Sequence, residues 1–509
     1  MKQKLLITSL LAIALGLFGN CEGGSSDSSG LALAALGGGG GGATVASNLS
    51  DVSAASYDDN SHGLISASTL RTWIADWANN KPAGITGNLV IFQADKVGTG
   101  STKNAIATAT GVYVYISVAP YINFRGDRDN GLITVKGQGL LTGAAIDTWF
   151  QTYNVDPTKD LIVFAGGAAE PYGNIGRAYY ILRYWGVSLN HLAILNGTVK
   201  GQFPESELAD DGLAPPLGGT FSVKQLKNVD NRILALSIED TIKAVRDNGH
   251  HGIAGLSSKI YISDNRTKSN NDASTLTYTN TAGWQEYNGG ENATGSTNSG
   301  VVAFEGHLKG AVFVPHYNFV DRSSNSDYAY GASAAGTFST YKFKSKAVIK
   351  NLWDTYSIGK DPDNPTQDNP NSPNVGAPAY EEGQTVLQYC RTNTRTMTSG
   401  ITTLVILGRP TVFLEDGWSI FGWLAGNLPA ANFTDDNATG NFPSIPAEFA
   451  PDLQGVIESG TRGSGLGAHY NGSGANTKVL KSKIDYFTVN PSATTTKKAQ
   501  NEDWAYKNQ

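Results

Sequence analysis

Short apolar runs alternate with amphipathic helical patterns along most of this 509-residue chain. Parallel strands must be joined by long crossover connections, usually helices, so this alternation is typical of an α/β domain with a mainly parallel sheet. The same order of elements occurs twice, which indicates a tandem duplication. The predicted helices are 66–77, 142–153 and 176–185 in the first copy and 237–246, 347–357 and 398–407 in the second. The predicted strands are 88–92, 112–118, 160–164 and 192–195, then 258–263, 385–389 and 412–414.

The expected fold class is therefore α/β, with two tandem domains that each contain a mainly parallel sheet flanked by helices. The length agrees with more than one domain, because single cores rarely grow beyond about 250–300 residues. The predicted segments are a signal peptide (1–20), a flexible Gly/Ser-rich tether (21–63), a first domain (64–203), a linker (204–232), a second domain with long insertions (233–490) and a C-terminal tail (491–509).

The composition argues against some classes of partner. The net charge is −6, only 16% of residues are charged, and Lys and Arg form no basic stripe, so we expect no nucleic-acid binding. The seven His residues are dispersed, and His250-His251 has no carboxylate or cysteine nearby at metal-ligand spacing. The glycine run 37–42 lacks the lysine of a phosphate-binding loop. We therefore expect no metal site and no cofactor.

The first of the two cysteines, Cys21, follows a segment that is typical of export. Lys2 and Lys4 precede an apolar run, 5–18, that is too short for a typical membrane span. The segment resembles a bacterial lipoprotein signal, although Asn20 stands where Gly or Ala is usual. The resemblance implies export and lipid attachment at Cys21, which would anchor the protein to a bacterial membrane on its periplasmic or cell-surface side. The alternative is an ordinary secretory signal with an incidental cysteine.

The second cysteine, Cys390, directly follows a predicted strand and has Arg391 and Arg395 close in sequence. At the carboxyl end of a parallel strand, loop N–H groups and the N-terminus of the next helix create positive potential, and the two arginines add to it. This potential favours a thiolate and suits an anionic substrate. The alternative is a buried structural cysteine, which is common. Because two nearby arginines disfavour an apolar burial site, we interpret Cys390 as a catalytic nucleophile.

Several motifs, in the correct order, resemble the tandem-domain rhodanese family of sulfurtransferases. The segment 390–395, Cys-Arg-Thr-Asn-Thr-Arg, resembles the family's active loop Cys-Arg-x-Gly-x-Arg. The turn 416–419, Asp-Gly-Trp-Ser, is similar to the family's Asp-Gly-Ser-Trp, and the segment 264–266, Asp-Asn-Arg, to its Asp-x-Arg. The segment 305–311 resembles Gly-His-Ile-Pro-Gly-Ala, and 176–186 resembles the helix of the family's inactive first domain.

The resemblance implies a ping-pong transfer of sulfane sulfur from thiosulfate, or a related donor, to a thiol or cyanide acceptor. Cys390 would attack the donor and become a persulfide. The first copy has no cysteine in its loop and is expected to be chemically silent. The implied substrate-binding residues are Arg391, Thr392, Asn393, Thr394, Arg395, Arg266 and Trp418. A structural salt bridge is an equal alternative for Arg395, and structural roles are equally open for Arg266 and Trp418.

The chain departs from the family pattern at several points. Asn393 replaces a Gly that is expected to need a left-handed backbone, where Asn is the best substitute. Lys309 replaces a Pro, and long polar insertions occur at 269–298 and 361–376. A second interpretation therefore stays open, a non-catalytic surface or periplasmic binding lipoprotein that retains the fold. Phosphatase chemistry is disfavoured, because cysteine phosphatases use Cys-x5-Arg and this loop is Cys-x4-Arg.

Overall fold

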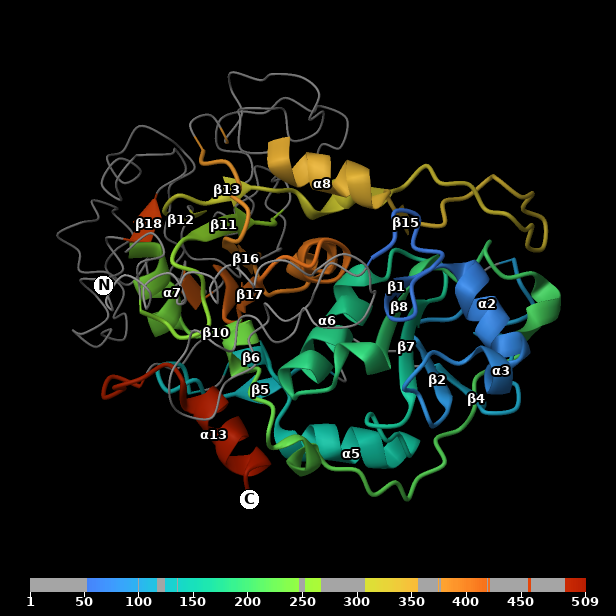
Figure 1. Ribbon diagram of the computed structural model, residues 1–509, viewed down its shortest axis with the longest axis horizontal. Coiled ribbons are helices and arrows are strands. Elements are labelled where there is room, and N and C mark those ends of the chain that lie inside the picture. Colours follow the sequence, from blue (N-terminus) through green and yellow to red (C-terminus); the bar gives the residue numbers. More distant parts are fainter. Residues whose placement is uncertain are drawn as a thin grey trace, which may run out of the picture. The chain divides into compact units, whose positions relative to one another are not determined.

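Two parallel sheets form the framework of the protein in its computed structural model (Figure 1). Both lie in the compact unit Ala43–Gln509. The residues that the structure describes are 53–98, 100–116, 124–134, 136–246, 252–266, 307–355, 374, 377–418, 420–421, 456–458 and 490–509. Cys21 and the insertion 269–298 lie outside them. No helix within these ranges combines the length and the apolar character needed to cross a bilayer.

The first sheet has five parallel strands in the order β1-β8-β7-β2-β4. The bounds of the strands are Gly63–Ile65 (β1), Leu89–Gln93 (β2), Val112–Ile116 (β4), Leu161–Gly166 (β7) and Leu192–Thr198 (β8). The central strands β2 and β7 are buried along their whole length. A parallel sheet covered on both faces has this burial pattern, which explains why β2 and β7 read as nearly continuous apolar runs in the sequence.

The second sheet repeats the arrangement as β10-β17-β16-β11-β13, again with all pairs parallel. The bounds are Ala235–Leu236 (β10), Ile260–Asp264 (β11), Val312–Phe313 (β13), Thr385–Tyr389 (β16) and Thr411–Leu414 (β17). Numbered by chain position within each sheet, both sheets follow the order 1-5-4-2-3. The predicted fold class, α/β with two tandem and mainly parallel sheets flanked by helices, is confirmed. We call the two sheets with their helices the first and the second repeat.

Helices connect the strands of both repeats. The α-helices of the first repeat are α2 (Ala67–Ala75), α3 (Trp77–Asn80), α5 (Gly143–Tyr153) and α6 (Tyr172–Tyr184). The α-helices later in the chain are α7 (Ile238–Arg246), α8 (Lys346–Thr355), α9 (Arg395–Gly400) and α13 (Lys498–Lys507). Short 3-10 helices are η3 (Leu189–His191), η4 (Glu205–Glu207), η5 (Val223–Leu226), η6 (Arg232–Leu234) and η7 (His316–Phe319), and η8 (Ile401–Ile406) is a π-helical segment.

Short antiparallel pairs complete the described part of the chain. They are β3 (Ala105–Ile106) with β9 (Leu208–Ala209), β5 (Gly126–Arg128) with β6 (Lys136–Gly139), β12 (His307–Leu308) with β18 (Ile457–Glu458), and β14 (Val320–Asp321) with β15 (Lys342–Phe343). The pair β5–β6 belongs to a connection of the first repeat that reaches the loop of the second, as described below.

The helix predicted at 398–407 begins earlier and changes its geometry part-way. It starts at Arg395 as α9 and continues as η8, where Leu407 N donates to Thr402 O, five residues back, at 2.9 Å. The segment 401–406 is rich in β-branched residues, which crowd the preceding helical turn. The wider π-helical turn is a local adjustment that often occurs near functional sites.

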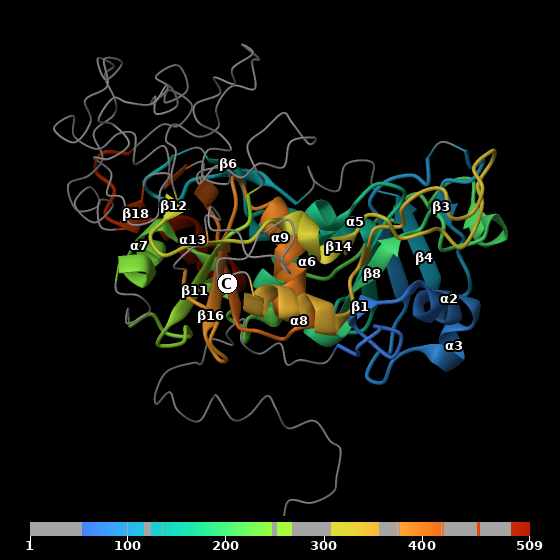
Figure 2. The ribbon, with the colours of Figure 1, turned by 90° about the horizontal axis from the view of Figure 1, so that it is seen from above.

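Helix α6 is buried on nearly every side because it packs against its own strands β7 and β8 and also against α9 of the second repeat. The two helices lie side by side (Figure 2). Gly176 permits the close approach, since a Cβ there would lie 2.9 Å from the Cβ of Met397. One apolar cluster accordingly includes residues of both repeats, for example Phe164 and Leu387.

The C-terminal residues, which the sequence predicts only as a tail, form the docked helix α13. Asp503 of α13 makes a buried ion pair with Arg128, with 2.9 Å between Oδ1 and Nη2, and accepts a hydrogen bond from Tyr184 OH at 2.8 Å. Tyr506 OH donates to Asp147 at 2.7 Å. The end of the chain is thus packed against the first repeat and holds the β5–β6 connection through Arg128.

Candidate functional site

Cys390 follows β16 directly, and the loop 390–394 leads into α9, as the sequence predicts. The turn after β17 contacts this loop, because Trp418 N donates to Cys390 O at 2.8 Å. Gly417 has a φ of +63°, and a Cβ at this position would lie 2.3 Å from Arg391 O. Glycine is therefore required both for the backbone conformation and for the close approach. The fold brings together two of the motifs that the sequence analysis singled out.

Asn393 adopts the left-handed conformation that the sequence analysis expected. Its φ is +58°, and its buried side chain donates from Nδ2 to Leu414 O at 2.5 Å. The next residue, Thr394, returns to right-handed values, with φ −85° and ψ −56°. Successive residues of opposite hand turn their backbone N–H groups toward one side and form an anion-binding concavity. The loop after Cys390 therefore has the backbone geometry of an anion site.

Cys390 itself is only 1% exposed. The expectation that its neighbouring arginines would disfavour burial is not met, but the surroundings are charged rather than apolar. Burial opposes the charge on Arg177, yet Glu415 raises the pKa of this arginine overall, and the sulfur of Cys390 adds to the effect. Burial likewise opposes the charge on Arg266, but Asp264 raises the pKa of this arginine overall, and the sulfur of Cys390 adds to the effect. Two buried guanidinium groups thus lie within electrostatic reach of the sulfur.

Arg266 is fully buried at the end of β11, and its guanidinium is held by Asp264, with 2.5 Å between Nη2 and Oδ2 and 2.9 Å between Nε and Oδ1. It also lies over the ring of Trp418, at 5.0 Å from the centroid, and near the ring of Tyr389, at 5.8 Å. Such cation–π contacts are favourable when the cation is desolvated. Asp264 and the two aromatic rings thus hold the Arg266 guanidinium in place.

The remaining predicted residues of the loop are half-buried. These residues are Arg391, Thr392, Thr394 and Arg395. Burial and the nearby Arg266 lower the pKa of Arg395 to about 9, so this side chain still carries its charge at neutral pH. The loop therefore combines N–H groups of the backbone with fixed positive charge, the two features that stabilise a bound anion.

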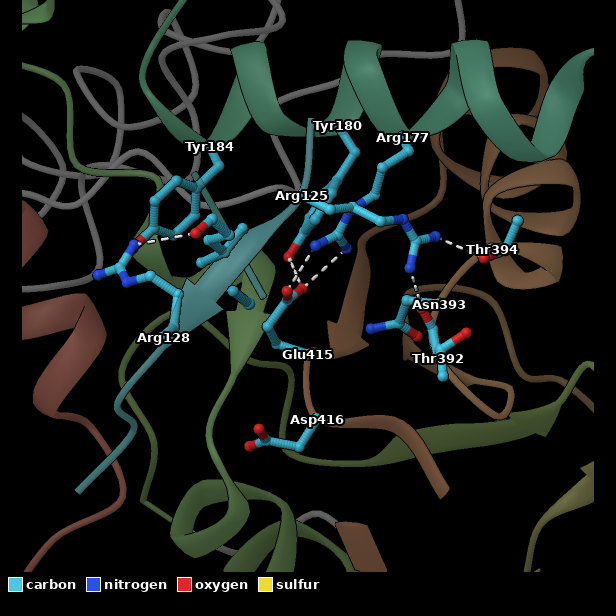
Figure 3. A network of polar contacts seen from close by, with 12 residues as sticks. Arg125, Arg128, Arg177, Tyr180, Tyr184, Thr392, Asn393, Thr394, Glu415 and Asp416 are labelled. Carbon is cyan, nitrogen blue, oxygen red and sulfur yellow. Dashed lines mark hydrogen bonds and ion pairs between the residues drawn. The ribbon is translucent and has the colours of Figure 1, made fainter. Parts of the chain in front are cut away.

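Two arginines of the first repeat also reach this site, and neither was predicted from the sequence (Figure 3). Arg177 of α6 pairs with Glu415, which stands just before the turn that contacts Cys390. Arg125, just before β5, donates from Nη1 to Thr392 O at 3.2 Å and from Nη2 to Thr394 Oγ1. The partners are more than 200 residues apart in sequence, so no local pattern could have found them.

The first repeat contains an equivalent loop that is occupied by one of its own side chains. The registers of the two sheets align β2–β7 with β11–β16, which places Gly166 at the position of Cys390 and Asp95 at that of Arg266. The carboxylate of Asp95 accepts hydrogen bonds from Gly167 N and, at 3.3 Å, from Ala168 N. The Asp95 carboxylate thus takes up the N–H groups that could otherwise bind an anion. The loop also has no thiol, in agreement with a chemically silent first repeat.

His316 is a buried residue beside the site, and no sequence pattern points to it. It follows β13 as the first residue of η7, which contacts α9. Asn265 links this region to the cysteine strand, because its N donates to Tyr389 O at 2.8 Å and its Nδ2 to Val314 O at 3.0 Å. Burial, together with the charge of Arg322, lowers the pKa of His316 to about 3. The imidazole is therefore neutral at physiological pH.

No protein-family model and no curated protein sequence matches the chain. Similar solved structures are distant in sequence. Tum1 from Saccharomyces cerevisiae is 12% identical, with a TM-score of 0.43 over 71% of this chain and 95% of Tum1. SseA from Escherichia coli, a 3-mercaptopyruvate sulfotransferase with the rhodanese fold, is 14% identical, with a TM-score of 0.39 over 70% of this chain and 98% of SseA.

An anaerobic ergothioneine biosynthesis enzyme from Chlorobium limicola, solved with trimethyl histidine, is 12% identical, with a TM-score of 0.41 over 70% of this chain and 68% of that enzyme. The fold of the present chain is defined by its own two parallel sheets of identical strand order, which agree with the tandem rhodanese-like fold expected from the motifs.

Proposed function

We propose that the protein is a sulfurtransferase that carries a sulfane sulfur on Cys390. The observation that supports this most is the loop 390–394, in which the lone described thiol stands at the carboxyl end of β16 and is followed by backbone of alternating hand at Asn393 and Thr394. Thiosulfate and related donors are anions, and such a loop can hold an anion next to the sulfur that attacks it.

In the first half of the reaction, the Cys390 thiolate attacks the outer sulfur of thiosulfate. A new S–S bond forms, the old S–S bond breaks, and sulfite leaves with the bonding electron pair, so that Cys390 becomes a persulfide. In the second half, cyanide or a thiolate attacks the outer sulfur, and thiocyanate or a new persulfide leaves as the Cys390 thiolate is restored. No electrons enter or leave over the whole cycle.

The side chains of the site have distinct roles in this scheme. Arg391, Arg395 and the N–H groups of the loop bind the donor and stabilise the negative charge of the persulfide. Arg266, held by Asp264 and stacked on Trp418, fixes a further positive charge at the end of β11. Thr392, Asn393 and Thr394 contribute through the backbone conformation that they give the loop.

A direct test is the formation of thiocyanate from thiosulfate and cyanide by the purified full-length protein. We expect turnover with the native chain and, with Cys390→Ser, only the rate seen without protein. The serine variant keeps the size of the side chain but removes the thiolate. An equal rate in the two proteins would exclude the proposed chemistry.

The specific observation in favour of a second function is the 1% exposure of Cys390. A binding lipoprotein that retains the fold without turnover does not need an accessible sulfur. Incubation with thiosulfate distinguishes the two functions. A binding protein takes up the anion reversibly, leaves it unchanged and gains no mass. A transferase releases sulfite in proportion to the amount of protein.

We further propose that the protein is exported and held on a membrane by lipid attached to Cys21. The support is the signal-like segment 1–20 and the Gly/Ser-rich stretch that follows it, and two or more acyl chains would suffice for stable anchoring. Labelling of cells with palmitate tests the proposal. The native chain should incorporate label and Cys21→Ala should not; equal labelling of both would rule out Cys21 as the anchor.

A further inference from the structure

Arg125 joins the first repeat to the cysteine loop of the second. The residue is 9% exposed, and its guanidinium donates to the carbonyl oxygen of Thr392 at 3.2 Å and to the hydroxyl oxygen of Thr394 (Figure 3). The two acceptors flank Asn393, the residue with positive φ. A single guanidinium thus contacts the loop on both sides of the residue where the backbone changes hand.

This contact determines which way one peptide group of the loop points. In a trans peptide the C=O and the following N–H point in opposite directions. Because Thr392 O accepts from Arg125, the N–H of Asn393 must point away from Arg125. The same contact adds a positive charge at the loop, in addition to Arg391 and Arg395. The orientation of the N–H groups, and with it the shape of the anion site, therefore depends on Arg125.

Arg125 is itself held in place from the first repeat. It directly precedes β5, which pairs with β6, and Arg128 at the end of β5 is anchored by the buried carboxylate of Asp503. Arg128 Nη1 also donates to Leu140 O at 3.1 Å, and Nη2 to Ala499 O at 3.0 Å. Arg128 thus fixes the segment that carries Arg125, through contacts that do not involve the cysteine loop.

We propose that Arg125 is a positioning residue of the Cys390 site, supplied by the repeat that has no cysteine, and that it organises the loop to bind an anionic sulfur donor. The inference deepens the proposed sulfurtransferase function and rests on it for the identity of the donor. It assigns the first repeat a part in the reaction, since the loop is incomplete without a side chain from that repeat.

The experiment compares Arg125→Gln and Arg125→Lys with a matched control, Arg71→Gln. Arg71 is likewise an arginine of the first repeat with two side-chain partners, Glu207 at 2.6 Å and Tyr328 at 2.9 Å, but it is half-buried, lies on α2 and does not contact the loop. All variants are made in the full chain with Cys21→Ser, so that Cys390 is the one thiol. Urea unfolding of each variant reports stability separately.

We expect Arg125→Gln to raise the KM for thiosulfate about tenfold, with a smaller change in kcat, because one charge-assisted contact to the loop is lost. Arg125→Lys should recover part of the loss, and Arg71→Gln should match the parent. If KM and kcat of Arg125→Gln equal those of Arg71→Gln, Arg125 only joins the two repeats and the proposal is wrong.

A second readout does not require turnover. Binding of thiosulfate to the Cys390→Ser protein, in which no sulfur is transferred, is measured by calorimetry with and without Arg125→Gln. Loss of the contacts of Arg125 to Thr392 O and Thr394 Oγ1 should weaken this binding about tenfold. If the native chain transfers no sulfur, the proposed function fails, but the binding measurement still decides the role of Arg125: weaker binding in Arg125→Gln supports it, and equal binding overturns it.

Discussion

Arg177 of α6 and Glu415, the residue after β17, form a buried ion pair through two hydrogen bonds, with Nη1–Oε2 at 3.0 Å and Nη2–Oε1 at 2.6 Å. Tyr180 OH donates to the same carboxylate at 3.0 Å. Arg177 belongs to the first repeat, whereas Glu415 precedes the turn whose Trp418 N contacts Cys390 O. The position of the cysteine loop is therefore linked to the first repeat through a buried polar cluster.

Removal of one partner should be costly. We expect Arg177→Met to lower the free energy of unfolding by about 3–5 kcal/mol, because it leaves the Glu415 carboxylate buried without its counter-ion. Urea unfolding followed by tryptophan fluorescence measures the change. The double variant Arg177→Met/Glu415→Leu, which removes both charges, should recover much of the loss. A single variant within about 1 kcal/mol of the native chain would contradict the buried-pair account.

The left-handed conformation of Asn393 gives a prediction with an internal control. Asn393→Gly and Asn393→Ala both lose the hydrogen bond to Leu414 O, but only Ala adds a Cβ at positive φ. We expect Ala to be less stable than Gly by about 1–2 kcal/mol. Thermal and urea unfolding of the two variants give the difference directly. Equal stabilities would mean that the loop relaxes to another backbone conformation.

Burial of neutral His316 predicts a dependence of stability on pH. Its pKa is lowered from 6.5 to about 3 in the folded protein, mainly by burial and also by Arg322, so below 6.5 the unfolded chain binds a proton that the folded protein does not. The stability that neutral His316 contributes to the folded protein is fully present above pH 6.5 and is lost as the pH falls toward 3.

Relative to His316→Gln, the native chain should lose up to about 1.4 kcal/mol of stability per pH unit below the unfolded pKa. Urea unfolding of both proteins at about pH 7 and about pH 5 isolates the effect, since other groups titrate in both. If the free energies of unfolding of the two proteins change equally with pH, His316 is protonated in the folded state or is not buried.

Local patterns in the sequence were sufficient for much of the fold. The strand 385–389 was predicted with its observed bounds, because β16 is a short apolar run followed by a polar loop. The left-handed Asn393 was also expected, from the resemblance of its loop to a pattern with Gly at that position. Both are properties of a few consecutive residues, which is the scale on which sequence patterns are informative.

Other features depend on which distant segments meet. Arg177 lies in the segment 176–186 that the sequence singled out, but neither it nor Arg125 had a predicted role, and their importance comes from partners in the second repeat. The burial of Cys390 was missed for the same reason, because the flanking arginines say nothing about the turn 416–418 that packs on the loop. The early start of α9 and its change to a π-helical turn depend on packing against α6 and β17 as well as on β-branched residues.

A sulfur carried on Cys390 adds to the mass of the intact protein, so mass spectrometry detects it. After incubation with thiosulfate, we expect a gain of one sulfur atom that maps to the peptide containing Cys390, disappears when cyanide is added and does not occur in Cys390→Ser. The absence of any gain with thiosulfate or another sulfane donor, or the same gain in Cys390→Ser, would show that Cys390 does not carry a transferable sulfur.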